Sequence, residues 1–356
     1  MKLTIGLPSG IGDASWALSK LYAVRDQIRE IRIADGWPLR TIPYVHLFWS
    51  PEERAARPVV ETPDDPREKL PGTSYGNFTY QTIRQFEAVN EIAYAPGYSP
   101  TWADVLSKVG GYGQILLQPN NHLEAGLPLA SWLADLPTEY HYPLYVDPAD
   151  LQSAQQMLAR LLTTKPLVGV SCASYRGAEG WKTWGRAQWT LLLQNIIRHG
   201  WQPVLLGGSW DDLTSGVAAA LNLPDLVGRT NVPEMVGLLT HLDAYLGFSS
   251  GLGVVRTVLN KPALSLWPDF QKELSTSWAP PDMLSAGRYV ACPYRDPVLD
   301  TWPVVKRFLN LCEEEKRDGE RQAQRQAQEA EVQTGQAGIL RGYSVGMGTW
   351  PASKVS

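Results

Sequence analysis

The chain has 356 residues, a net charge of −4 at pH 7 and a sequence pI of about 5.8, and 44% of its residues are hydrophobic. This length and apolar content can bury one large or two medium cores, and two are expected. The acidic balance lacks the basic field of a protein that holds nucleic acid by its phosphates, although a single basic groove would escape such a count.

The cysteines and the N-terminal sequence indicate the cellular compartment in which the protein is expected. Cys172, Cys292 and Cys312 are widely spaced and form neither a zinc pattern nor a disulfide framework, which predicts a reducing compartment. The stretch MKLTIGLPSG lacks the apolar core of a signal peptide, and no run of about 18 apolar residues occurs. We therefore expect a soluble, cytoplasmic protein without a transmembrane segment.

The first predicted strand, LTIGL, runs into a glycine turn and a helix, PSGIGDASWALSKL. Gly10 and Gly12 permit positive φ in the turn, and Asp13 stands where an N-cap residue belongs. A dinucleotide-binding loop would need a third glycine at Ser15 and an acidic residue after a second strand. Asp35 has about the right spacing but follows no clear strand. The stretch is therefore either an ordinary helix start or the floor of a different active site.

Short apolar runs alternate with helical patterns up to about residue 147: IPYVHLFW, EIAYA and QILLQP. The proline- and charge-rich stretch 50–77 predicts a long surface loop of the kind that often binds ligands. In LQPNNHLEAG, His122 and Glu124 would either bind hydroxyl groups of an acceptor or belong to a capped turn. The stretch EYHYPLYVDPADLQ predicts a linker, with a new helix starting at Asp150.

Strands and helices alternate more clearly after the linker. Predicted strands are PLVGVSCAS, QPVLLGG, DAYLGFSS and PALSLWP, and predicted helices include VPEMVGLLTHL and RAQWTLLLQNIIRHG, which Gly200 closes. This alternation predicts parallel sheets covered by helices, in two units. From Pro297 a further helix runs into a polar, repetitive tail, which is either a solvated helix extension or disordered.

Four loops of the second unit have ligand-binding character. One carries Arg176 and Lys182 after a strand, although both could be ordinary surface cations. The stretch LLGGSWDD ends a strand with two glycines, and LVGRTNVPEM is a turn before a helix with Glu234 in its first turn. The stretch SSGLGVVRT follows a strand, and its helix start offers N–H groups to a diphosphate. Each loop alone is weak evidence for a ligand-binding site. The occurrence of all four in order within one unit is stronger evidence for it.

In this order the motifs resemble the ADP-heptose:lipopolysaccharide heptosyltransferases, glycosyltransferase family 9, over roughly residues 1–312. The shared parts are GIGD, KTW…W (Lys182, Trp184, Trp189), LLGG, LVGRTNVPEM and SSGLGVVRTVLNKP. The resemblance implies an α/β protein of the GT-B fold, with two Rossmann-like domains whose parallel sheets face a central cleft. It implies an acceptor domain at 1–147, a donor domain at 151–296, a C-terminal helix packing back on the body at 297–317 and a polar tail at 318–356.

The resemblance also implies roles for single residues. Asp13 would be the catalytic base, and Lys182 would bind the donor phosphate. Together with the four loops, the resemblance gives the expected donor-binding residues as Ser174, Tyr175, Arg176, Lys182, Gly208, Gly228, Thr230, Ser249, Ser250, Gly251 and Gly253. On the acceptor side, the expected residues are Gly10, Gly12, His122 and Glu124.

The function implied is an inverting glycosyltransferase that moves a sugar from a nucleotide-activated donor to a hydroxyl acceptor. No Asp-x-Asp motif is visible, so neither a metal nor a cofactor is expected. Ser249 and Ser250 stand where the family has Asp-Thr, and Val254 where it has His, so ADP-heptose is not assumed as the donor. The acceptor is a lipopolysaccharide core, another glycan or a modified DNA base. A nucleotide-sugar epimerase and a non-catalytic binding protein are the alternatives, and a monomer is expected.

Overall fold

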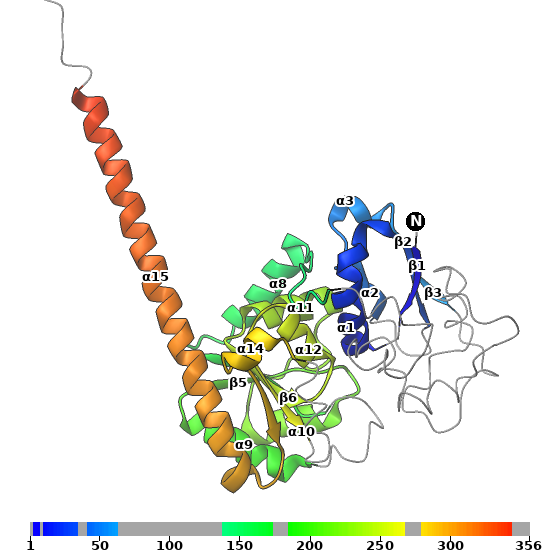
Figure 1. Cartoon of the computed structure of the whole chain (residues 1–356). Coiled ribbons are helices and arrows are strands. Elements are labelled where there is room, and N and C mark those ends of the chain that lie inside the picture. The colour runs from blue at the N-terminus through cyan, green and yellow to red at the C-terminus, as the bar shows by residue number, and fades with distance from the viewer. Residues whose placement is uncertain are drawn as a thin grey trace, which may run out of the picture. The chain divides into compact units, whose positions relative to one another are not determined.

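The computed structural model describes residues 3–7, 10–34, 41–62, 137–173, 184–267 and 279–343. The chain forms two compact units, residues 1–309 and 310–356. The described part of the first unit contains two parallel sheets with their helices (Figure 1).

The smaller sheet has the parallel order β1-β2-β3, formed by β1 (Leu3–Leu7), β2 (Ile28–Ala34) and β3 (Val59–Thr62). Its connections contain α1 (Ile11–Leu21), the 3-10 turn η1 (Tyr22–Gln27), α2 (Thr41–His46) and α3 (Pro51–Arg54). Helix α1 turns Ala14, Leu18 and Leu21 inward, at no more than 1% exposure, as its apolar spacing predicts.

Three sequence predictions in this region are corrected. Residues 28–34 form strand β2, which the charged residues of IREIRIA made hard to recognise in the sequence. The run IPYVHLFW belongs mainly to helix α2, because its buried members Tyr44, Val45 and Phe48 recur at helical spacing. The expected long loop begins with helix α3 and strand β3, and its part beyond Thr62 lies outside the described residues, as do EIAYA and QILLQP.

The larger sheet has the parallel order β5-β4-β6-β7-β8. Its strands are β4 (Leu167–Ser171), β5 (Gln202–Leu205), β6 (Ala244–Phe248), β7 (Ala263–Trp267) and β8 (Tyr289–Pro293). The first four confirm the predicted strands, and β8 was not predicted. The chain proceeds from β4 outward to β5 and then returns to β6 on the other side of β4. The switch point of the sheet therefore lies between β4 and β6.

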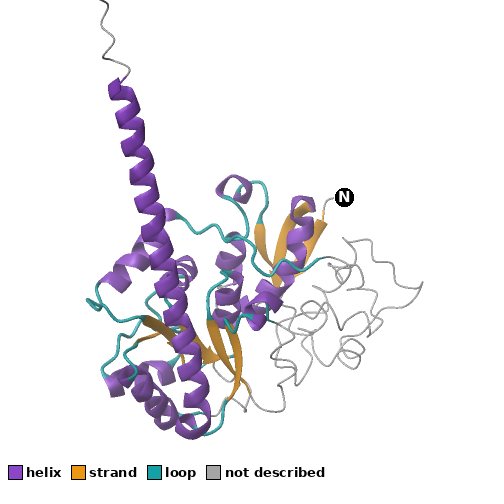
Figure 2. Cartoon of the chain, turned by 60° about the vertical axis from the view of Figure 1, so that its left-hand side comes forward, coloured by secondary structure: helices purple, strands orange, loops and turns teal. Residues whose placement is uncertain are grey.

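Helices cover both faces of this sheet (Figure 2). They are α8 (Pro148–Ala159), α9 (Arg186–Arg198), α10 (Asp212–Leu221), α11 (Val232–His241), α12 (Gly251–Val258) and α14 (Pro281–Ser285). Helices α9 and α10 pack together on one face, while α11 packs on α8 and α12 on the other. Strands β6 and β7 are buried along their whole length, as expected for central parallel strands.

The C-terminal part begins with a π-helical turn, Pro297–Thr301, and continues as α15 (Trp302–Tyr343). Of the two alternatives for the polar tail, the helix extension is therefore the one present as far as Tyr343. The side chains from 316 to 329 are exposed, which agrees with their polar composition. None of the described helices is long and apolar enough to cross a membrane.

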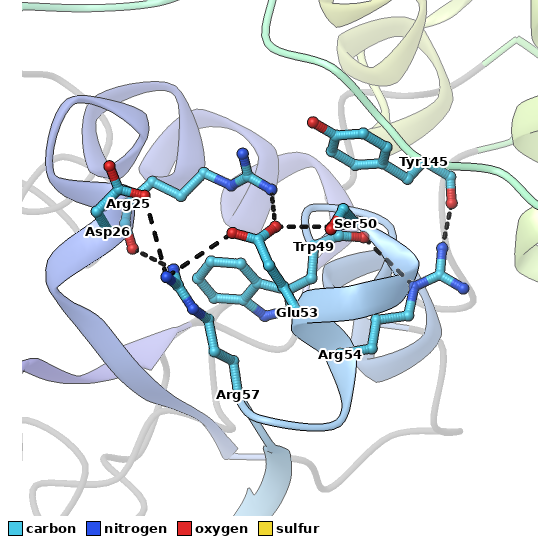
Figure 3. A network of polar contacts seen from close by, with 8 residues as sticks. All are labelled: Arg25, Asp26, Trp49, Ser50, Glu53, Arg54, Arg57 and Tyr145. Atoms are coloured by element: carbon cyan, nitrogen blue, oxygen red, sulfur yellow. Dashed lines mark hydrogen bonds and ion pairs between the residues drawn. The ribbon is translucent and has the colours of Figure 1, made fainter.

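A polar network braces the segment that joins the two sheets (Figure 3). Arg54 donates to the carbonyl oxygen of Tyr145 and binds the Asp147 carboxylate at 3.1 Å. Glu53 accepts from the Ser50 backbone at 2.9 Å and pairs with Arg25. Arg57 lies 3.7 Å from Glu53, 3.9 Å from Asp26 and 4.8 Å above the Trp49 ring. The three arginines face three carboxylates, so the network is a structural brace rather than an anion site.

Candidate functional site

The first turn of α1 lies at the carboxyl end of β1. The Ala14 amide donates to the Gly10 carbonyl oxygen at 2.8 Å, so the helix begins at Ile11 and Asp13 is its third residue. The predicted N-cap position of Asp13 is therefore wrong, because the helix begins three residues before the start that a cap at Asp13 would give. A carboxylate in the first turn is still favourable at the positive end of the helix dipole.

The residues around the glycine turn do not match a dinucleotide-binding loop. Strand β2 ends at Ala34, directly before Asp35, so the missing second strand does exist. Ser15 is buried and its Oγ donates to the Ile11 carbonyl oxygen at 2.6 Å, where the fingerprint requires glycine. A Cβ on Gly12 would lie 3.1 Å from Cα of Gly251. The close approach that Gly12 permits is therefore made by helix α12.

Helix α12 starts at the carboxyl end of β6 and meets α1 there. A Cβ on Gly251 would lie 3.0 Å from the Gly12 amide nitrogen, and one on Gly12 would lie 3.5 Å from Cγ2 of Val254. The two first turns are thus in backbone contact, with Val254 packed against α1. Of the predicted site residues, the structure brings Gly12 and Gly251 into contact, while Gly10 and Asp13 are neighbours of Gly12 along the chain.

The N-cap residue of α12 is Ser250, and its hydroxyl group lies 3.1 Å from the hydroxyl of Tyr245. Tyr245 has no exposed surface, and burial raises the pKa of its hydroxyl. Gly253 lies over the same ring, because a Cβ there would be 3.4 Å from Cε1 of Tyr245 and 3.2 Å from Oγ of Ser265. Two of the predicted donor-binding residues, Ser250 and Gly253, therefore contact this tyrosine at the start of α12.

Two further motifs meet at the carboxyl end of β5. The Gly228 amide donates to the Gly207 carbonyl oxygen at 3.0 Å, so the LLGG and LVGRT turns lie together and Gly208 and Gly228 belong to one corner. Gly228 has φ +68°, and a Cβ there would lie 2.8 Å from Cα of Ser209. Only glycine suits this position. Next to it, the Thr230 hydroxyl is buried and has no partner among the described residues.

A buried carboxylate near this corner was missed by the sequence analysis. Asp211 caps α10, accepting from the Thr214 amide at 2.9 Å and from its hydroxyl at 2.5 Å. The Thr214 hydroxyl in turn accepts from the Cys172 amide at 3.0 Å. Burial raises the pKa of Asp211 and that of the Cys172 thiol. The spacing of WDDLT, an aspartate three residues before a threonine, is the signal that predicts such a cap.

The two tryptophans of the KTW…W motif belong to the core. Trp184 and Trp189 pack edge to face at 5.3 Å between ring centroids, and Phe248 of β6 packs on both. Trp184 Nε1 donates to the Arg295 carbonyl oxygen at 3.1 Å. Their function is therefore structural: Trp184 anchors the chain two residues after Lys182.

Arg256 and His141 make hydrogen bonds in the second half of α12, away from the first turn of that helix. Arg256 is fully buried and donates from Nε to the Pro262 carbonyl oxygen at 3.1 Å and from Nη2 to that of Leu242 at 2.8 Å. His141, from the segment between the sheets, contacts the Thr257 carbonyl oxygen at 2.9 Å through Nδ1. Its Nε2 lies 3.0 Å from the Asp282 carboxylate. These contacts fix the position of α12.

Six predicted site residues lie outside the described residues: Ser174, Tyr175, Arg176 and Lys182 on the donor side, and His122 and Glu124 on the acceptor side. Ser249 follows β6 directly, at the same sheet edge as Ser250. Across the described ranges, no three His, Cys, Asp or Glu side chains come together as a metal site would require.

Comparison with known proteins gives one family. The family model for glycosyltransferase family 9 (heptosyltransferase) matches residues 116–293, half of the chain. Lipopolysaccharide heptosyltransferase 2 of Escherichia coli (strain K12) is 29% identical over 126 residues, which make up 32% of this chain and 36% of that protein. The same enzyme of Salmonella typhimurium matches with the same identity and coverage. The chain thus matches about a third of the length of these curated relatives.

Solved structures show the fold. The structure of E. coli ADP-heptose lipopolysaccharide heptosyltransferase II matches with a TM-score of 0.56 at 16% identity, covering 89% of this chain and 100% of that one. A glycosyltransferase family 9 protein from Veillonella parvula DSM 2008 matches with a TM-score of 0.51 at 12% identity, covering 88% and 97%. The α/β architecture with parallel sheets is therefore GT-B, as the resemblance implied.

Proposed function

The chain belongs to glycosyltransferase family 9, and on that premise we propose that it transfers a sugar from a nucleoside diphosphate to a hydroxyl acceptor. The supporting observation is the backbone contact between Gly12 and Gly251. Each glycine lies in the first turn of a helix that follows a parallel strand, where α/β sheets bind their ligands. Asp13, next to Gly12, is thereby close to the start of α12.

The proposed mechanism is a single displacement with inversion. The Asp13 carboxylate accepts the proton of the acceptor hydroxyl as that oxygen forms its bond to the anomeric carbon. The bond from this carbon to the diphosphate oxygen breaks at the same time. The negative charge that develops on the diphosphate is stabilised by the first-turn N–H groups of α12 and by Lys182. No step uses a metal ion or a cofactor.

The donor pocket that we propose differs from the family pattern in its charge. Ser249 and Ser250 stand in place of Asp-Thr, and Val254, in place of His, packs against α1. The backbone N–H groups that would bind a diphosphate do not depend on these side chains. We therefore propose that the donor contains a nucleoside diphosphate, as the donors of the family do. Its base and its sugar are to be identified by screening. The acceptor is a glycan, such as a lipopolysaccharide core, or a modified nucleobase.

The proposal is tested by screening nucleotide sugars for thermal stabilisation. A donor at a hundredfold above its Kd stabilises the folded protein by about 2.7 kcal/mol. The donor found is then incubated with and without candidate acceptors, and free diphosphate is measured. Release that requires an acceptor supports transfer. Conversion of the donor sugar without an acceptor would indicate an epimerase. Binding of the donor without any turnover would indicate a non-catalytic binding protein.

We further propose that the protein works in the cytoplasm as a monomer. Cys172 and Cys292 are free and buried, as in a protein that stays in a reducing compartment. Sedimentation at micromolar concentration checks the monomer, and a dimer there would contradict it.

A further inference from the structure

The Tyr245 hydroxyl lies at the switch point of the larger sheet, beside the ends of β4 and β6. It is 3.1 Å from the Ser250 hydroxyl, at the start of α12. Ser171, the last residue of β4, lies close by, because a Cβ on Gly247 would be 2.7 Å from the Tyr245 hydroxyl oxygen and 2.9 Å from the Ser171 carbonyl oxygen. The Ser171 hydroxyl itself donates to the Ala173 carbonyl oxygen at 2.8 Å, so Ser250 is the hydroxyl that Tyr245 holds.

Ser250 occupies a cap position but does not act as a cap. A serine at this position normally accepts a hydrogen bond from an N–H group in the first turn. Asn231 does so for α11, accepting from the Glu234 amide at 2.8 Å. In the described part of the chain, the Ser250 side chain makes no capping bond to α12. Its hydroxyl is held by Tyr245 instead.

The Tyr245 ring occupies space that two glycines leave open. A Cβ on Gly247 would lie 2.7 Å from the Tyr245 hydroxyl oxygen, and one on Gly253 would lie 3.4 Å from Cε1 of the ring. The ring is therefore enclosed by strand β6 on one side and by the first turn of α12 on the other.

We propose that Tyr245 is a positioning residue that keeps Ser250 from capping α12 and so leaves the first-turn N–H groups available to the leaving diphosphate. This inference rests on the proposed function, which supplies the diphosphate. Without the tyrosine hydroxyl, Ser250 Oγ is released to accept from the Gly253 amide. A diphosphate would then have to displace that bond before it could bind.

The test compares diphosphate affinities by calorimetry, using whichever of ADP, GDP, UDP and CDP binds the wild-type protein. Tyr245→Phe should weaken binding about fivefold, the size of one typical serine cap. Adding Tyr245→Phe to the Ser250→Ala variant should change the affinity no further than Ser250→Ala alone does, because no Ser250 hydroxyl is left to compete. Tyr44→Phe, which removes a buried hydroxyl that pairs with Tyr142 at 2.9 Å, is the control and should change nothing.

Wild-type affinity in Tyr245→Phe would overturn the inference. A fivefold loss of affinity on adding Tyr245→Phe to the Ser250→Ala variant would overturn it as well, because that loss would come from packing and not from the Ser250 hydroxyl. A wild-type protein that binds none of the four diphosphates would overturn the proposed function. In that case exchange of the Gly253 amide, followed by NMR without ligand, still decides whether Tyr245 holds Ser250. Slower exchange in Tyr245→Phe and not in the double variant supports it, and unchanged exchange overturns it.

Discussion

Gly12 and Gly251 lie backbone to backbone, with 3.1 Å between the position of a Cβ on Gly12 and Cα of Gly251. A side chain on either residue would have to push α1 and α12 apart, because the atom nearest to each added Cβ is a main-chain atom of the other helix. This contact joins the two sheet edges at which donor and acceptor are proposed to meet.

Gly251→Ala should therefore lower the free energy of unfolding by about 1–3 kcal/mol, the usual cost of overpacking. It should also weaken diphosphate binding, since α12 moves. Gly319→Ala is the matched control: its Cβ would meet nothing within 4 Å in the exposed helix α15. Alanine is the better helix former, so this control should not lose stability. Urea unfolding of both variants decides, and equal stabilities would contradict the close contact.

Lys182→Ala should weaken diphosphate binding by about 1.5–3 kcal/mol, because the proposed contact is charge-assisted. Lys165→Ala makes the same change of charge at an exposed residue before β4, at the opposite edge of the sheet. Calorimetry should find the wild-type affinity in this control. Unchanged affinity in Lys182→Ala would remove the lysine from the donor site.

Asp211 should make stability depend on pH. Burial raises its pKa in the folded state above the ordinary value of 3.8, so the folded protein binds this proton more readily than the unfolded chain. Its contribution is then most favourable at low pH and is lost as pH rises from about 3.8 through the raised pKa. Asp211→Asn keeps a cap but cannot titrate. The difference in unfolding free energy between the two proteins should change across this window, and a constant difference would contradict the assignment.

Ending the chain after Asp318 should leave the melting temperature and the activity nearly unchanged. The side chains from 316 to 329 are exposed, so little apolar burial is lost with them. The segment from Val298 to Cys312 is kept in this variant. A fall of several degrees in a thermal melt would show that the removed part contributes to the fold.

The sequence alone predicted the second half of the chain better than the first. Strands β4 to β7 have continuous apolar runs because both of their faces are buried, and their turns contain glycine or a capping residue. Strand β2 was missed because Arg29, Glu30 and Arg32 interrupt its apolar residues. The start of α1 was placed three residues late because Asp13 resembles a cap, although Gly10 provides the first helical carbonyl.

The sequence predicted which glycines belong to the candidate site but not which segments they contact. Glycine motifs mark close approaches along the sequence, and Gly228, Gly251 and Gly253 do lie at such places. Which segment makes each approach depends on the tertiary fold, so the pairing of Gly12 with Gly251 could not be read from either motif. Tyr245 was missed for the same reason: its partner Ser250 is five residues away, beyond the end of the strand.

The rate of diphosphate release by Asp13→Asn tests the central claim most directly. Asparagine keeps the size of the side chain but cannot accept the acceptor proton. If Asp13 is the general base, turnover with a working acceptor should fall by about 10²–10⁴, while diphosphate affinity should stay at the wild-type value. Stability should fall by no more than about 1 kcal/mol, from the lost first-turn charge. A fully active Asp13→Asn protein would contradict the account and leave Asp13 as a favourable charge at the start of α1.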